Sequence, residues 1–84
     1  VLLSLTSMSQ DWGKKNQLAA YNNAKIKLIA QEHNCTFIDL YTPLMDITTG
    51  ELKESYTYDG AHLTAQGYIT LTNAITPIIA ELLV

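Results

Sequence analysis

The sequence predicts an α/β fold with parallel strands. Residues 1–5 form an apolar run rich in branched side chains, which is typical of a strand covered on both faces. A second short strand is predicted at residues 36–38, after a long segment with helical periodicity. Two strands joined through a helix form a βαβ unit, so we expect them to be adjacent, parallel and linked by a right-handed crossover.

Size and composition limit what the chain can be. It has 84 residues, of which 48% are hydrophobic and 15% charged, as in a single small globular unit. A chain of this length removes only about 60–65% of its unfolded surface from water. Because the first predicted strand also starts at the first residue, with no segment before it, we expect the chain to be a piece of a larger domain.

Charge and targeting signals exclude several classes of partner. The net charge is −3 and no basic cluster is present, which argues against nucleic acid as a partner. No charged segment precedes an apolar stretch, and no run is long and apolar enough for a transmembrane segment. The single cysteine, Cys35, cannot form an intrachain disulfide, which together with the missing signal favours a cytoplasmic protein.

The first helix is predicted over residues 16–33, after an irregular loop at residues 7–13. Its apolar side chains share one broad arc, which we expect to cover the sheet, while Asn23, Lys27 and Gln31 lie on the other side. Asn22 falls within the apolar arc and is interpreted as a structural amide. The arc consists of Leu18, Ala19, Tyr21, Ile26, Leu28 and Ile29.

The end of this helix needs no chemical explanation. Asn34 suits the left-handed position that follows many helices, and His33 suits a solvated place in the last turn. Cys35 is interpreted as a small buried residue that enters the strand. Residues 34–36 also form a glycosylation sequon, which matters only in a secretory compartment.

The segment after the second strand begins with Asp39, at the carboxyl end of that strand. This edge binds ligands in open α/β sheets, but capping of the next turn is the favoured role for Asp39. Residues 41–45 are predicted to form a short turn packed by Leu44, residues 46–50 a tight turn ending in Gly50, and residues 51–58 a connector.

The last helix is predicted over residues 65–83, with Thr64 as its N-cap. Thr70, Asn73 and Glu81 lie opposite its apolar side, and Pro77 projects from the polar face, where a bend can tolerate it. The apolar side consists of Tyr68, Leu71, Ile75, Ile79 and Leu82, widened by Ile78 and Leu83.

Asp59 and His62 are the candidate catalytic residues. They stand three residues apart in a loop before the last helix, with Gly60 between them to ease a turn. A carboxylate that accepts from the Nδ1–H of a histidine selects its tautomer and leaves Nε2 as a base for a nearby hydroxyl. The spacing alone also fits a turn aspartate and a surface histidine. No cluster of cysteines or histidines accompanies them, so we expect no metal and no cofactor.

The wider sequence resembles a known family. Residues 58–68, Tyr-Asp-Gly-Ala-His-Leu-Thr-Ala-Gln-Gly-Tyr, resemble the final block of the SGNH, or GDSL-like, hydrolases, where an Asp-x-x-His pair precedes the last helix. Residues 37–40 and 46–52 are similar to the last strand and connector of that family, especially of its platelet-activating-factor acetylhydrolase-like members. The resemblance covers nearly the whole chain and is specific only in the final block.

This resemblance implies a flavodoxin-like three-layer α/β/α domain, of which residues 1–84 are the C-terminal portion. It implies a serine esterase or acylhydrolase in which His62 is the general base and Asp59 orients it. The family's Gly-Asp-Ser and Gly-x-Asn-Asp blocks are absent, and the serines of this chain lack that context: Ser4, Ser7, Ser9 and Ser55.

The partners implied by the resemblance are an ester substrate and the N-terminal remainder of the domain. The alternative is a non-catalytic α/β interaction module or a degenerate hydrolase relative, which could use an open strand edge. A redox or metal protein would need more thiols or imidazoles than one cysteine and two histidines supply.

Overall fold

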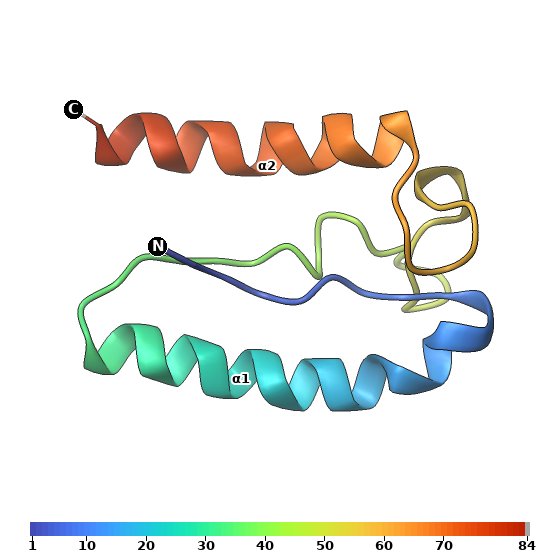
Figure 1. Ribbon diagram of the computed structural model, residues 1–84, viewed down its shortest axis with the longest axis horizontal. Coiled ribbons are helices and arrows are strands. Elements are labelled where there is room, and N and C mark those ends of the chain that lie inside the picture. Colours follow the sequence, from blue (N-terminus) through green and yellow to red (C-terminus); the bar gives the residue numbers. More distant parts are fainter. Residues whose placement is uncertain (84) are drawn as a thin grey trace.

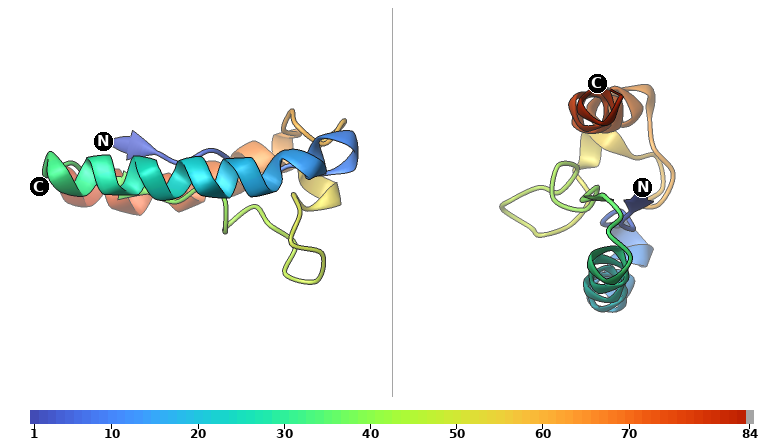
Figure 2. Two further views of the ribbon diagram at one scale, coloured as in Figure 1. Left: turned by 90° about the horizontal axis from the view of Figure 1, so that it is seen from below. Right: turned by 90° about the vertical axis from the view of Figure 1, so that its left-hand side faces the viewer.

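A short parallel sheet lies between two long helices in the computed structural model, which describes residues 1–83 (Figure 1). The elements follow in the order β1 (Leu2–Leu3), 3-10 helix η1 (Gln10–Lys15), α1 (Asn16–Glu32), β2 (Phe37–Ile38), 3-10 helix η2 (Glu54–Tyr56) and α2 (Ala65–Leu82). The end-on view in Figure 2 places α1 and α2 on opposite sides of the strands. Neither helix in this part of the chain has the length and hydrophobicity that crossing a membrane requires.

The strands pair in parallel, which confirms the predicted βαβ unit. Leu2 lies opposite Phe37 and Leu3 opposite Ile38, and the Leu2 N–H donates to the Thr36 carbonyl at 2.8 Å. The strands are shorter than predicted, with two residues each. Leu3 and Leu5 remain 45% and 47% exposed, so the described residues by themselves do not cover both faces of this segment.

The buried face of α1 differs from the predicted one. Ala19, Asn23 and Ala30 are buried, although Asn23 was placed on the outer side. Small side chains let a helix backbone approach the strands closely, and the Asn23 amide binds the Leu5 backbone, which a leucine could not do. Most of the predicted apolar arc is therefore solvent-exposed, at Leu18, Tyr21, Leu28 and Ile29.

The end of α1 confirms one expectation and corrects another. Asn34 has a φ of +56°, the left-handed position predicted for it, and His33 is exposed as expected. Cys35 is exposed rather than buried. Its N–H donates to the Ala30 carbonyl at 2.8 Å, so Cys35 still belongs to the turn that closes the helix, and β2 begins only at Phe37.

The segment between β1 and α1 is more ordered than predicted, since residues 10–15 form η1. Asn16 holds this segment in place: its Oδ1 accepts from the Met8 N–H at 2.7 Å, and its Nδ2 donates to the Met8 carbonyl at 2.7 Å. A side-chain amide can bind both the N–H and the carbonyl of one residue. Hydrophobic periodicity does not reveal such contacts.

The chain between β2 and α2 follows the prediction closely. Leu44 is fully buried, and the Gly50 N–H donates to the Asp46 carbonyl at 2.7 Å in the tight turn of residues 46–50. Met45 and Leu52 then form an isolated antiparallel bridge. Within the predicted connector, residues 54–56 form η2.

Helix α2 begins as predicted, because the Thr64 hydroxyl accepts from the Gly67 N–H at 3.2 Å. Gly67 is buried against the carbonyl of Tyr56 in η2, where a Cβ would come within 2.5 Å of that oxygen. Tyr68 is exposed rather than part of the packed side, and Pro77 is exposed as expected. The half-buried apolar positions are Leu71, Ile75, Ile78 and Ile79, whereas Leu82 and Leu83 are exposed.

Candidate functional site

The loop that carries Asp59 and His62 is closed on itself directly before α2. Thr57 and Leu63 form an isolated antiparallel bridge across its base, and the Tyr58 N–H donates to the His62 carbonyl at 3.3 Å. The loop therefore has a narrow neck, from which the chain enters α2 at Ala65.

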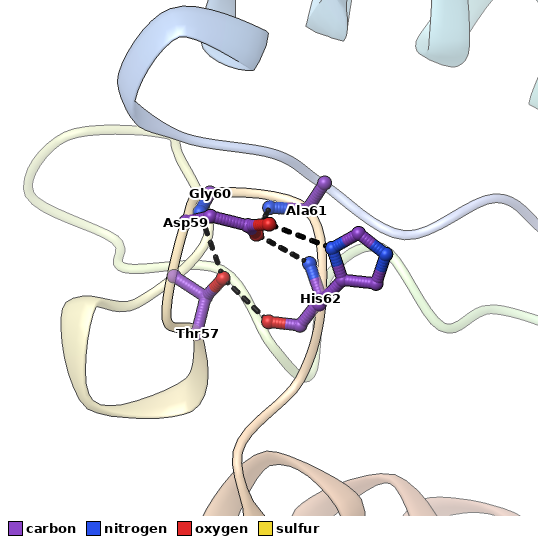
Figure 3. A network of polar contacts seen from close by, with 5 residues as sticks. All are labelled: Thr57, Asp59, Gly60, Ala61 and His62. Atoms are coloured by element: carbon purple, nitrogen blue, oxygen red, sulfur yellow. Dashed lines mark hydrogen bonds and ion pairs between the residues drawn. The ribbon is translucent and has the colours of Figure 1, made fainter.

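Asp59 contacts three groups of the loop with its two carboxylate oxygens (Figure 3). Its Oδ2 lies 2.7 Å from His62 Nδ1, and its Oδ1 accepts from the backbone N–H groups of Ala61 at 2.9 Å and His62 at 2.8 Å. The structure thus brings the two candidate catalytic side chains into direct contact. The same carboxylate also forms an Asx turn, the local hydrogen-bonded structure that aspartate favours.

A buried threonine closes the loop from the inside. The Thr57 hydroxyl donates to the His62 carbonyl at 2.6 Å and accepts from the Gly60 N–H at 2.9 Å. Thr57 is 7% exposed. Its single hydroxyl therefore connects the middle of the loop to the backbone of the histidine.

Gly60 connects the loop to the segment after β1. The Ser9 N–H donates to the Gly60 carbonyl at 2.9 Å, and a Cβ on Gly60 would collide with the Ser9 carbonyl oxygen. Gly60 also has a φ of +95°, where side chains other than hydrogen are strained. Glycine is therefore required here both by the backbone conformation and by the close approach of Ser9.

Hydrogen bonds from the backbone N–H groups of His62 and Ala61, followed by the His62 side chain, hold the pKa of Asp59 well below its usual value of 3.8. Asp59 is therefore ionised at neutral pH. The side chains of His62 and Asp59 are 82% and 49% exposed, so the imidazole is open to other groups.

This geometry can hold a base in one tautomer. When Nδ1 carries the proton, it donates to Asp59 Oδ2, and the lone pair of Nε2 remains available. Within residues 1–83 no group is hydrogen-bonded to Nε2, which points away from Asp59 in Figure 3. An imidazole oriented in this way can accept a proton from a hydroxyl brought to its open side.

Asp39 caps the turn that follows β2. Its Oδ1 accepts from the N–H groups of Tyr41 at 2.9 Å and Thr42 at 3.3 Å, which confirms the favoured role. Burial raises the pKa of Asp39, but the hydrogen bonds from Thr42 and Tyr41 outweigh burial and the net shift is downward. Asp39 takes no part in the contacts around His62.

Two of the four serines, Ser4 and Ser7, bind the backbone with their hydroxyls. The Ser4 hydroxyl accepts from the Leu40 N–H at 2.7 Å, and the Ser7 hydroxyl donates to the Tyr41 carbonyl at 3.4 Å. In the part of the chain that the structure describes, no serine hydroxyl is bonded to His62, and no three acidic, histidine or cysteine side chains cluster as metal ligands would.

Sequence reasoning did not identify Thr57 as part of this site. Thr57 stands two residues before Asp59 and belongs to no recognisable motif. Its hydroxyl reaches the His62 carbonyl only in the closed loop, so the contact is not evident from the sequence. The only available signal was a threonine in a stretch otherwise interpreted as a connector.

Among family models, curated proteins and solved structures, only solved structures match this chain. No protein-family model and no curated protein matches the sequence. The solved structures that resemble it include a protein from Bacteroides fragilis described as an acylhydrolase (TM-score 0.82, 29% identity), a GDSL-like lipase from Bacteroides thetaiotaomicron (0.79, 26%) and a protein from Streptococcus pneumoniae described as a platelet-activating factor (0.60, 29%). They match 99%, 95% and 92% of this chain, which spans 42%, 42% and 39% of theirs.

These resemblances confirm the family likeness predicted from residues 58–68. The chain is similar to GDSL-like lipases and acylhydrolases in fold and, at 26–29% identity, in sequence. It spans about two fifths of the length of these structures.

Proposed function

We propose that residues 1–84 are the C-terminal portion of one serine ester hydrolase domain with a flavodoxin-like three-layer α/β/α fold. In this proposal His62 is the general base and Asp59 is the carboxylate that orients it. The rest of the domain supplies the serine nucleophile and the oxyanion hole, and an ester is the substrate.

The observation that carries the proposal is the 2.7 Å contact between Asp59 Oδ2 and His62 Nδ1. It leaves Nε2 on the exposed side of the ring, where a base must stand to take a proton from a serine hydroxyl. The likeness to an acylhydrolase and a GDSL-like lipase supports an ester as the substrate class.

The base is assigned to this chain, and the nucleophile and oxyanion hole to the rest of the domain. A base without an activated nucleophile and without donors for the oxyanion has little to assist. The Ser4, Ser7 and Ser9 side chains are buried, and within residues 1–83 no serine hydroxyl is hydrogen-bonded to His62. We therefore expect the purified 84-residue chain not to hydrolyse a short-chain aryl ester above background.

The test uses the complete protein, expressed from its whole reading frame. We expect it to hydrolyse a short-chain aryl ester and to be labelled on a serine outside residues 1–84 by an organophosphonate, which reacts with activated serines. Reading the codons before Val1 for Gly-Asp-Ser and Gly-x-Asn-Asp is the first step. Inactivity on a broad ester panel with no serine labelled would reject the proposal.

A second candidate, a non-catalytic α/β interaction module, has one observation in its favour. The α1 side chains Leu18, Tyr21, Leu28 and Ile29 are between 48% and 60% exposed, and exposed apolar side chains on one helix can form part of an interaction surface. The same ester panel separates the two candidates, because an interaction module turns over no substrate whatever precedes Val1.

A further inference from the structure

The Asp59–His62 pair has little side-chain packing to hold it. The His62 side chain is 82% exposed and that of Asp59 49%, so neighbouring atoms restrict the imidazole only weakly. Its position relative to Asp59 must therefore come from the backbone of the loop. The backbone is set by hydrogen bonds inside the loop: Asp59 itself accepts from two backbone N–H groups, and one further side chain binds two other backbone groups.

That side chain is Thr57, whose hydroxyl is used in both directions. As a donor it binds the His62 carbonyl at 2.6 Å, and as an acceptor it binds the Gly60 N–H at 2.9 Å (Figure 3). Within residues 1–83 the Gly60 N–H has this single partner, whereas the His62 carbonyl also accepts from the Tyr58 N–H at 3.3 Å. Gly60 is buried, so water does not readily replace the threonine.

We propose that Thr57 is a positioning residue for His62, because its buried hydroxyl ties the histidine backbone to the turn at Gly60 and so holds the imidazole on Asp59. The effect on catalysis rests on the function proposed above, whereas the effect on the geometry of the loop does not. Thr57 itself touches neither substrate nor the reacting nitrogen.

Valine has nearly the same shape as threonine but lacks the hydroxyl. Valine would leave the Gly60 N–H without a partner in a buried place, and a buried unpaired donor is strongly disfavoured. Gly60 would then turn toward water. The adjoining Ala61 and His62 N–H groups, which donate to Asp59 Oδ1, would be displaced with it. The imidazole would then sample positions away from Asp59.

The kinetic test compares Thr57→Val with Thr57→Ser in the complete protein, on an aryl ester. Thr57→Val is expected to lower kcat about 10- to 100-fold with KM changed less than about threefold, because misplacing a base affects the transition state more than binding. Thr57→Ser keeps the hydroxyl and is expected to stay within about threefold of the wild-type kcat.

The matched control is Thr64→Val. The Thr64 hydroxyl also has two bonds, donating to the Ser55 carbonyl at 2.9 Å and accepting from the Gly67 N–H at 3.2 Å, but neither partner belongs to residues 57–62. Thr64→Val is expected to lower the melting temperature through loss of the N-cap, with kcat within about twofold of wild type. This control separates a general loss of protein stability from a specific displacement of His62.

A second readout does not depend on activity. The pKa of Asp59 is lowered by hydrogen bonds from His62 and Ala61, so its carboxyl titration, followed by NMR, reports whether the loop is closed. In Thr57→Val the pKa of Asp59 is expected to rise toward its usual value, and in Thr57→Ser to remain low.

The outcomes are distinguishable. An inactive wild type would reject the proposed function, yet a raised pKa of Asp59 in Thr57→Val alone would still support Thr57 as the positioning residue. An unchanged pKa of Asp59 with wild-type kcat in Thr57→Val would overturn the inference. If Thr57→Val does not fold, Thr57→Ala takes its place, and a tenfold loss of kcat in Thr57→Ser would by itself overturn it.

Discussion

Asn23 binds both backbone groups of Leu5. Its Oδ1 accepts from the Leu5 N–H at 2.7 Å, and its Nδ2 donates to the Leu5 carbonyl at 3.1 Å. Two helical turns earlier, Asn16 does the same to Met8. The chain leaving β1 therefore pairs with side chains of α1 where it no longer pairs with β2.

Asn23→Ala tests this arrangement. Removing a buried amide leaves the Leu5 N–H without its partner and the Leu5 carbonyl with only the Ser4 hydroxyl, so we expect a loss of about 1–3 kcal/mol in the free energy of unfolding of the complete protein. Asn22→Ala is the matched control, because Asn22 is half-exposed and makes no side-chain hydrogen bond within residues 1–83. It should change stability by at most about 0.5 kcal/mol, measured by urea unfolding. Equal losses would refute the assigned buried face of α1.

Gly60→Ala and Gly50→Ala separate backbone strain from a steric clash. Both glycines have a positive φ, +95° and +75°, but only at Gly60 would a Cβ meet another atom, the Ser9 carbonyl oxygen. Gly50→Ala is therefore expected to cost about 1–2 kcal/mol from strain alone. Gly60→Ala should cost more, and it should also lower kcat because the loop must move. A kcat lowered equally in both variants would contradict this account of Gly60.

His62→Ala in the complete protein removes the proposed base. What remains is substrate binding and the oxyanion hole, so we expect kcat to fall about 10³-fold or more. His33→Ala is the control, since His33 is an exposed residue at the end of α1 and should leave kcat unchanged. Loss of turnover in His33→Ala with turnover retained in His62→Ala, both proteins being folded, would show that the site is assigned wrongly.

Asp59→Asn keeps the shape of the side chain and removes its charge. The amide can stabilise the other imidazole tautomer, so we expect kcat to fall about 10- to 10³-fold, less than for His62→Ala. The double variant should be little worse than His62→Ala, because the two side chains act as one unit. Additive losses, measured on the same ester, would show that Asp59 acts independently of His62.

The lowered pKa of Asp59 predicts how stability depends on pH. Hydrogen bonds to the ionised carboxylate stabilise the folded state above the pKa of the unfolded chain, near 3.8, and this stabilisation is lost as the pH falls through the lower folded-state pKa. The difference in unfolding free energy between wild type and Asp59→Asn should therefore be constant above about pH 5 and shrink below it. Urea unfolding across this range checks the sign, and a difference that grows in acid would contradict it.

Local sequence patterns determined much of the fold. The helices begin and end within one residue of their predicted bounds, because Thr64 supplies an N-cap and Asn34 a left-handed stop, and both act through atoms close in sequence. The parallel pairing of β1 with β2 followed from their separation by a helix. The Asp59–His62 pair was likewise visible, since three residues of loop bring the two side chains together.

The tertiary structure decided what depends on long-range contacts. Which face of α1 is buried was settled by the amides of Asn16 and Asn23, which bind unpaired backbone after β1, rather than by hydrophobicity. The position of the loop was settled by Ser9 against Gly60, 51 residues apart in sequence, and by the closure that brings Thr57 to the His62 carbonyl. Hydrogen bonds of this kind are directional and form only when both partners are in place. The periodicity of apolar residues therefore does not predict them.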